Sequence, residues 1–312
     1  MIYKTTAKFN NPCFLKLLEK CDLCPRKCFV NRASGELGFC TASNDVKIAK
    51  ASLHHWEEPC ISGLLGSGTV FFSNCNLKCV FCQNHKISHD GYGKIVSISR
   101  LSEIFLEQQS RGALNINLVT PSHYVPQIIE ALKLAKSCGL NIPILYNSNG
   151  YENVDTIKIL RGFIDVYLPD LKYYNDKYAV KYSKAPNYFA SARAVITEMV
   201  SQVGAPKFDS DGILQKGVLI RHLMLPGLLF DSKKILDFVH STFNDSVYIS
   251  LMNQYTPMHE SFKYPEINKV INPNHYEALI NYALKIGITK CFIQESGTSS
   301  KSYVPNFDLS NV

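Results

Sequence analysis

The cysteines constrain this chain more than any other feature of its sequence. The 312 residues include eleven cysteines, and seven of these fall into two short groups. Closely spaced thiols in a reducing compartment are typical of metal or iron–sulfur sites. The two groups are a triplet, Cys75, Cys79 and Cys82, and a quartet, Cys21, Cys24, Cys28 and Cys40.

Two observations favour a reducing compartment. An odd number of cysteines does not suit a complete disulfide framework. The first residues, MIYKTTAKFNNPCF, contain no apolar core followed by a small-residue cleavage site, and no run approaches the roughly 20 apolar residues of a membrane span. We therefore expect a cytoplasmic protein without a membrane segment.

The sequence divides into two regions of different character. Residues 1–62 hold the quartet and show little helical or strand periodicity, so we expect a small cysteine-rich module that a bound metal helps to order. Residues 63–312 alternate short apolar runs with amphipathic segments. The chain length allows two such domains.

The second region predicts a parallel α/β fold, because its strand-like runs are apolar on both sides of the pleat. We expect helices capped by Ser99 or Ser102, by Ser122 and by Asn272. The number of units suits a partial (β/α)6-type, TIM-like barrel, with an open doubly wound sheet as the alternative. The expected strands are Thr69–Ser73, Asn115–Thr120, Ile142–Tyr146, Ile164–Leu168, Gly217–Leu223, Val247–Leu251 and Lys290–Gln294.

The triplet follows the first expected strand, so it lies on a loop at a strand's C-terminal end, where α/β barrels place their chemistry. Three thiolates bind one face of a [4Fe–4S] cube and leave one iron open, since such a cluster normally takes four cysteines. The alternatives are a zinc site completed by His85 or His89, and three free core cysteines.

The segment CNLKCVFC resembles the signature of the radical S-adenosylmethionine (SAM) superfamily. The resemblance covers roughly residues 20–255 and is best to the branch like the pyruvate formate-lyase activating enzyme, an oxidoreductase. It implies that Cys75, Cys79 and Cys82 hold a [4Fe–4S] cluster whose open iron binds SAM. It also implies reductive cleavage of SAM to a 5′-deoxyadenosyl radical that abstracts hydrogen from a substrate.

Later motifs of that branch resemble YNSNG, LPDLK and IRHLMLPG in this chain. A lysine can pair with the SAM carboxylate, and aspartate or asparagine can bind its ammonium and hydroxyl groups. The alternatives for these residues are a surface ion pair, a turn, and a charge at a strand end. The resemblance implies SAM-binding roles for Phe81, Thr120, Asn149, Asp170, Lys172 and Arg221.

The sequence departs from the branch at two places. Where the family has a Gly-Gly-Glu stretch, this chain reads LVTPSHY, so the acid is missing and Thr120, Pro121 and Ser122 offer only carbonyl or hydroxyl acceptors. Asn147 stands where activating enzymes often have aspartate, which bears on any cation site shared with Asp170.

The quartet matches either a structural zinc site or a second iron–sulfur cluster. Zinc would give the first module a purely structural role, whereas a cluster would let it relay electrons to the triplet. Spacing alone leaves both open. A similar cysteine-rich lead with an EEP-x-ISG stretch, here Glu57–Gly63, occurs in a subgroup of the activating-enzyme-like family.

Three functions follow as hypotheses. The first is a radical SAM enzyme that receives electrons from a reduced ferredoxin or flavodoxin and acts on a glycyl-radical enzyme partner. The second uses the same chemistry on RNA or another protein, and the net charge of +7 suits an acidic partner. The third is a non-enzymatic interaction protein with zinc at both cysteine groups.

Overall fold

The computed structural model describes residues 12–294 and 305–312, and its centre is one mixed β-sheet. The strands follow the order β10-β9-β8-β6-β5-β4-β2-β1-β3, and β7 pairs with β8 outside that path. From β2 to β10 every neighbouring pair is parallel, whereas β1 is antiparallel to both β2 and β3. The strands are β1 Val46–His54, β2 Ser67–Phe72, β3 Lys94–Val96, β4 Ile116–Val119, β5 Ile144–Ser148, β6 Val166–Pro169, β7 Lys207–Phe208, β8 Leu214–Leu223, β9 Tyr248–Met252 and β10 Cys291–Ile293.

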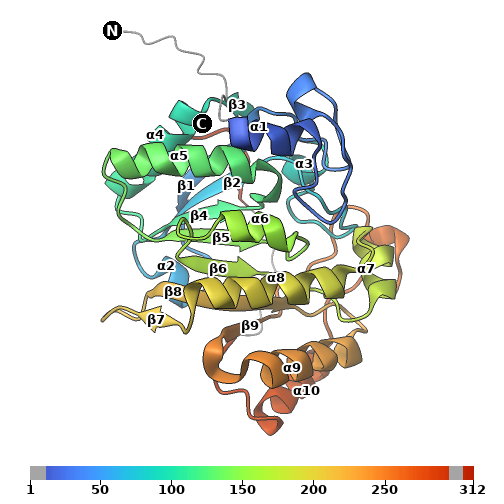
Figure 1. Ribbon diagram of the computed structural model, residues 1–312. Helices are drawn as coiled ribbons and strands as arrows, with labels where there is room; N and C mark the ends of the chain where they lie inside the picture. The colour runs from blue at the N-terminus through green and yellow to red at the C-terminus, as the bar shows by residue number, and fades with distance from the viewer. Residues whose placement is uncertain (1–11, 295–304) are drawn as a thin grey trace.

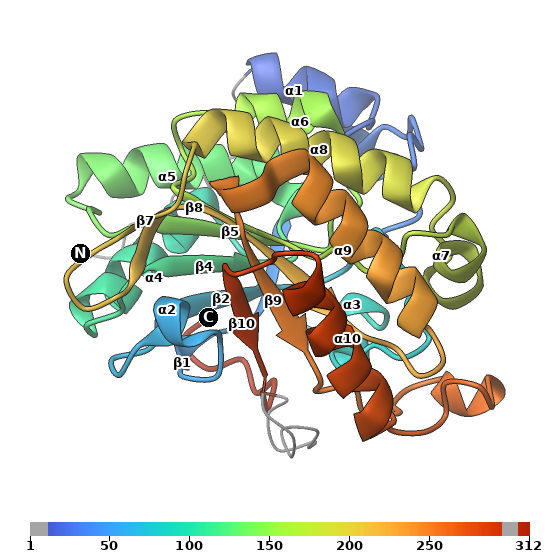
Figure 2. The ribbon, with the colours of Figure 1, turned by 90° about the horizontal axis from the view of Figure 1, so that it is seen from below.

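Helices connect the parallel strands, and in Figure 2 α5, α8 and α9 form an arc outside them. Strands β2 and β5 are buried along their whole length, as expected for strands covered on both faces. The helices are α1 Pro12–Glu19, α2 Pro59–Ser62, α3 His85–Ser88, α4 Ile98–Ser110, α5 Val125–Ser137, α6 Val154–Ile159, α7 Asp176–Ser183, α8 Tyr188–Val203, α9 Leu229–Phe243 and α10 Pro273–Lys285.

The α/β prediction is confirmed, and each expected strand overlaps one of the parallel strands. The strand order of the described residues ends at β10 on one side and β3 on the other, so the sheet is not closed. The partial (β/α)6-type barrel therefore stays a prediction.

The first region contains a strand that its sequence did not predict. Strand β1 is hydrogen-bonded along its length to β2, so residues 46–54 belong to the central sheet. Its alternation is only partial, because Ala49 is buried along with Ile48 and Ala51. In Figure 1 the blue segment before β1 lies at the end of the sheet where α3 and α7 also lie. The boundary at residue 62 between two domains stays a prediction.

Two of the three expected helix caps are wrong. Ser97, not Ser99 or Ser102, caps α4, since its hydroxyl accepts from the backbone N–H of Arg100 at 3.1 Å. Ser122 lies in a 3-10 turn, and its hydroxyl donates to a carboxylate rather than capping α5. Asn272 is confirmed as the cap of α10, where its side chain accepts from Asn274 N.

Within the two described ranges, no helix is long and apolar enough to cross a membrane.

Candidate functional site

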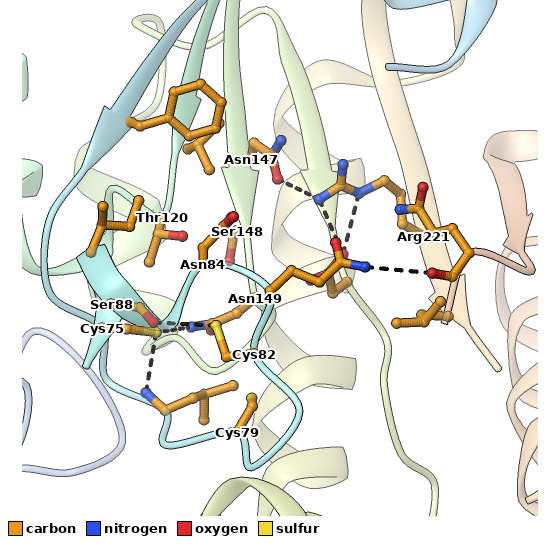
Figure 3. Close-up of a pocket in the computed structure, with 18 of the residues that line it drawn as sticks. Cys75, Cys79, Cys82, Asn84, Ser88, Thr120, Asn147, Ser148, Asn149 and Arg221 are labelled. Carbon is orange, nitrogen blue, oxygen red and sulfur yellow. Dashed lines mark hydrogen bonds and ion pairs between the residues drawn. The ribbon is translucent and has the colours of Figure 1, made fainter. Parts of the chain in front are cut away.

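A cavity of about 250 Å³ opens at the C-terminal ends of the parallel strands. Figure 3 shows the three cysteines of the triplet at one end of it, Asn147 and Arg221 at the other, and Asn149 between them. Every residue to which the sequence assigned a role in the cluster or in SAM binding lines this one cavity. These residues are Cys75, Cys79, Cys82, Phe81, Thr120, Asn149, Asp170, Lys172 and Arg221.

The triplet loop is fixed by contacts outside itself. Asn74 begins it in the left-handed region, with φ of 75°, which asparagine tolerates better than most residues. Further along, the backbone N–H groups of Lys78 and Val80 donate to the carbonyls of Ser183 and Tyr182 at the end of α7. Because Asn74 N also donates to Ile87 O at 2.8 Å, neighbouring segments hold the loop at its start and in its middle.

Each sulfur of the triplet has a polar partner. Leu77 N and Asn149 Nδ2 each lie 3.4 Å from Cys75 Sγ, and the Ser183 hydroxyl donates to Cys79 Sγ at 3.0 Å. The Ser88 hydroxyl lies 3.2 Å from the third sulfur. Hydrogen-bond donors aimed at sulfur stabilise thiolates, the form that binds iron.

Burial raises the pKa of the free thiols, of Cys75 to about 12 and of Cys79 to about 11. A bound metal removes these protons, since its charge outweighs the cost of burying a thiolate. Three cysteines with donors to their sulfurs, beside an open cavity, fit a cluster with one iron exposed. Neither His85 nor His89, proposed for the zinc alternative, lines this cavity.

The opposite wall of the cavity carries a network of charges. Asp170 contacts Lys172 Nζ at 2.6 Å and Arg221 at 3.2 Å, and Arg221 also contacts Glu57 at 3.1 Å. Burial alone would raise the pKa of Asp170, but the two cations lower it below its usual value. Burial would likewise lower the pKa of Lys172, but Asp170 and Cys79 raise it. Asp170 and Lys172 are therefore both charged at neutral pH.

Glu57 is a cavity residue to which the sequence assigned no role. Its carboxylate accepts from Asn117 Nδ2 at 3.1 Å and pairs with Arg221, so the cavity has an acid although the Gly-Gly-Glu stretch is missing. The EEP motif was the signal that could have found it, since it places two acids just before α2.

Asn147 also has a definite partner. Its Oδ1 accepts from Arg221 Nη2 at 2.5 Å, while Asp170 accepts from the same guanidinium. Asn147 and Asp170, which a shared cation site would use, both bind the guanidinium of Arg221 in this structure.

Thr120 follows β4 with φ of 57°. A β-branched residue in the left-handed region is strained, and such strain is concentrated at functional sites. Its backbone N–H donates to Asn147 O at 2.9 Å, which holds the strained residue at the cavity wall. Phe81 also lines the cavity, edge-to-face with Tyr255 at 5.7 Å.

A second buried acid lies behind the cavity. Glu152 Oε1 accepts from Ser122 at 2.5 Å, from Ser148 at 2.7 Å and from Tyr146 at 3.4 Å, and only 1% of the residue is exposed. Burial outweighs these hydrogen bonds and raises the pKa of Glu152 to about 7. No local sequence pattern pointed to Glu152, because the two serines that bind its carboxylate lie at the ends of different strands, β4 and β5.

This acid makes a pH prediction. The folded protein holds the Glu152 proton up to about pH 7, whereas the unfolded chain releases it near 4.5. Stability is therefore lost as the pH rises from 5 to 8, by roughly 2–3 kcal/mol from this group. Glu152→Gln should flatten that loss in urea titrations at several pH values, while Glu103→Gln, at an exposed acid, should not. Equal slopes for wild type and Glu152→Gln would contradict the raised pKa.

The quartet is also brought together. All four cysteines line a second, small cavity of about 20 Å³, beside Arg26, Arg32 and His123. The turn that returns Cys40 to the group passes so close to Cys28 that a Cβ at Gly38 would lie 2.9 Å from its sulfur. Each cysteine of the quartet and of the triplet is free of disulfides.

The family description "Radical SAM superfamily" matches residues 69–239. An uncharacterized protein of Methanocaldococcus jannaschii is 30% identical over 280 residues, which are 87% of this chain and 76% of that protein.

Two solved structures are also similar. Streptococcus suis SuiB bound to S-adenosylmethionine has a TM-score of 0.48 at 16% identity and covers 72% of this chain, which spans about half, 48%, of SuiB. A domain of a pyruvate-formate lyase-activating enzyme from Bacteroides vulgatus has a TM-score of 0.38 at 15% identity, covering 55% of this chain and 92% of that domain. The family match covers more than half of the chain, and the chain therefore belongs to the radical SAM superfamily.

Proposed function

We propose that this protein is a radical SAM enzyme whose triplet holds a [4Fe–4S] cluster with one iron open to SAM. The supporting observation is that the three cysteines and the polar residues assigned to SAM line the same cavity. Membership of the superfamily implies the cluster and SAM as cofactors. Cys75, Cys79 and Cys82 would hold the cluster, which would supply the one-electron chemistry for reductive cleavage of SAM and for hydrogen abstraction from the substrate.

The chain's own residues bind and orient SAM in this proposal. Lys172, held by Asp170, offers a cation for the SAM carboxylate. Glu57 and Asp170 offer acceptors for its ammonium and hydroxyl groups. Arg221 donates hydrogen bonds to Glu57, Asp170 and Asn147, so these side chains are oriented before SAM binds.

The triplet donors have a separate role. Asn149 Nδ2 donates both to Cys75 Sγ and to Asn76 Oδ1, at 3.4 and 2.7 Å. Because both donors of its amide are used in this way, we assign Asn149 to orienting the cluster loop rather than to SAM. Hydrogen bonds to a cluster sulfur also raise its reduction potential.

We further propose that the substrate is a protein, as in the activating-enzyme-like branch, with a glycyl-radical enzyme as the partner. Trp56 supports a protein substrate, because this residue lines the cavity and is 66% exposed at the same time. Exposed aromatic residues at a cavity mouth are typical anchors for a protein partner. A reduced ferredoxin or flavodoxin would supply the electron.

We also propose that the N-terminal quartet holds a metal centre of its own, either zinc or a second cluster. Its four cysteines line one cavity, which brings together the ligands that either centre needs.

Electron paramagnetic resonance of the anaerobic, dithionite-reduced protein tests the proposal. We expect a [4Fe–4S]⁺ signal that changes shape when SAM is added, because SAM would bind the open iron. A signal indifferent to SAM would overturn the enzyme proposal. In a second stage, a candidate glycyl-radical enzyme is added with SAM. A glycyl doublet supports the partner, and its absence with SAM-responsive iron would reject the partner alone.

A further inference from the structure

We propose that the quartet binds one zinc ion through its four thiolates, and that this zinc centre holds Cys75 of the triplet loop in place. The inference rests on the metal centre proposed above for the quartet and names its metal and its role, and it does not depend on the substrate. It rests on buried charge, on contacts to the sulfurs and on the size of the cavity.

Two arginines beside the quartet have no carboxylate partner. Arg32 is 1% exposed, and its guanidinium lies 3.8 Å from Cys21 Sγ. Arg26 stacks on Phe39, with its guanidinium 3.6 Å from the ring centre. Neither arginine forms an ion pair with any residue in 12–294 or 305–312, and Arg32 Nε and Arg26 Nη2 are buried without a hydrogen-bond partner there.

The buried guanidinium of Arg32 requires a nearby negative charge, since an unpaired buried ion costs several kcal/mol, and the half-buried Arg26 lies beside the same cavity. Four neutral thiols supply none. Four thiolates around Zn²⁺ carry four negative charges against two positive ones, a net charge of −2. That value balances Arg26 and Arg32, so the two cations have a counter-charge once zinc is bound.

Hydrogen bonds to the sulfurs favour the thiolate form as well. Phe39 N donates to Cys28 Sγ at 3.3 Å. The backbone N–H groups of Arg26 and Ala42 hydrogen-bond the sulfurs of Cys24 and Cys40. Metal-bound thiolates are typically stabilised by such second contacts.

The cavity favours a single ion over a four-iron cube. Its volume of about 20 Å³ is close to that of one water position, whereas the triplet faces about 250 Å³. His123 also lines this cavity. Its Nε2 faces Ser73 O at 2.8 Å and therefore carries the proton. Its Nδ1 is then an acceptor that has no hydrogen-bond partner among the described residues. No group of three or more His, Cys, Asp and Glu side chains in the described ranges already surrounds one metal position, so we infer that the thiols rotate inward on binding.

The quartet module contacts both neighbours of Cys75. Asn74 Nδ2 donates to Thr41 Oγ1 at 2.6 Å, beside Cys40. On the other side, Arg26 Nε donates to Asn76 O at 3.0 Å, and the Asn76 side chain hydrogen-bonds Cys24. An ordered quartet therefore fixes the backbone on both sides of Cys75, which makes it a positioning centre for the triplet.

Metal analysis of the full chain, prepared anaerobically, tests this. We expect one zinc and four irons per chain in wild type. A Cys75→Ala/Cys79→Ala/Cys82→Ala variant should keep its one zinc and lose all iron. Cys28→Ser should lose zinc at least tenfold, whereas Cys138→Ala, at an exposed thiol, should change neither metal. Eight irons in wild type with four in the triplet variant, or no metal in that variant, would overturn the proposal.

The positioning role has its own readout. Arg26→Gln removes the contact to Asn76 O and leaves all seven thiols in place. We expect this variant to bind iron but to show a broadened electron paramagnetic resonance signal with a weaker response to SAM. A signal identical to wild type would reject the positioning role, while the zinc count of the triplet variant would still decide the zinc site.

Discussion

Cys79→Ala should lower SAM cleavage by about a thousandfold or more, to below detection. Two remaining thiolates cannot hold a four-iron cluster that needs three, and residues that act as one unit lose most of the activity when any member is removed. Production of 5′-deoxyadenosine by the reduced protein, with iron per chain in the same sample, measures the effect. Retained cleavage would contradict the assignment of the triplet.

The matched control is Cys138→Ala, which removes the same atoms from an exposed thiol. It should leave cleavage within about twofold of wild type, because surface substitutions rarely change stability by more than about 0.5 kcal/mol. Ser183→Ala is a finer probe, since it removes the donor to Cys79 Sγ, together with a contact to the Tyr173 hydroxyl, and leaves the three ligands. We expect it to keep iron and to shift the reduction potential downward.

The triplet was predictable because its signal is local. Three thiols within eight residues after an apolar strand fix both the loop and its place at a strand end. Asp170 and Lys172 were similarly accessible, since they follow β6 directly and therefore reach the same edge as the triplet. For these residues, order along the chain and parallel strands suffice.

Glu57 and Glu152 depend on contacts that no local pattern reports. Glu57 lies three residues beyond β1, whose C-terminal end pairs with the start of β2, and it is held in the cavity by its contacts to Asn117 and Arg221. Strand β1 itself was missed because its apolar residues are short and interrupted by lysines. Glu152 is fixed by two serines from different strand ends. Such sites arise from packing between distant segments, which periodicity does not encode.

Arg221→Gln should lower the free energy of unfolding by about 3–5 kcal/mol, the usual effect of removing one partner from a buried ion pair. Arg221 contacts Glu57 and Asp170 at 3.1 and 3.2 Å, and its side chain is 14% exposed. Without its charge, both carboxylates are left with Lys172 as the cation nearest to them on this wall. Urea denaturation at pH 7 measures the loss.

Lys158→Gln is the matched control, because the side chains of Lys158 and its partner Asp155 are 55% and 94% exposed. An exposed pair contributes at most about 1 kcal/mol, so this variant should unfold close to wild type. If the two variants lose equal stability, the buried network does not stabilise the fold.

Arg221→Gln should also change how the free energy of unfolding depends on pH. In wild type the lowered pKa of Asp170 gives stability that is present above the ordinary aspartate range and is lost as the pH falls through the folded pKa. Removing Arg221 takes away one of the two cations that lower this pKa, so the carboxylate protonates at a higher pH and contributes less stability at neutral pH. We therefore expect the gap between Arg221→Gln and wild type to narrow as the pH falls from 7 to 4. A gap that stays constant would mean that Arg221 acts through packing of its side chain rather than through its charge.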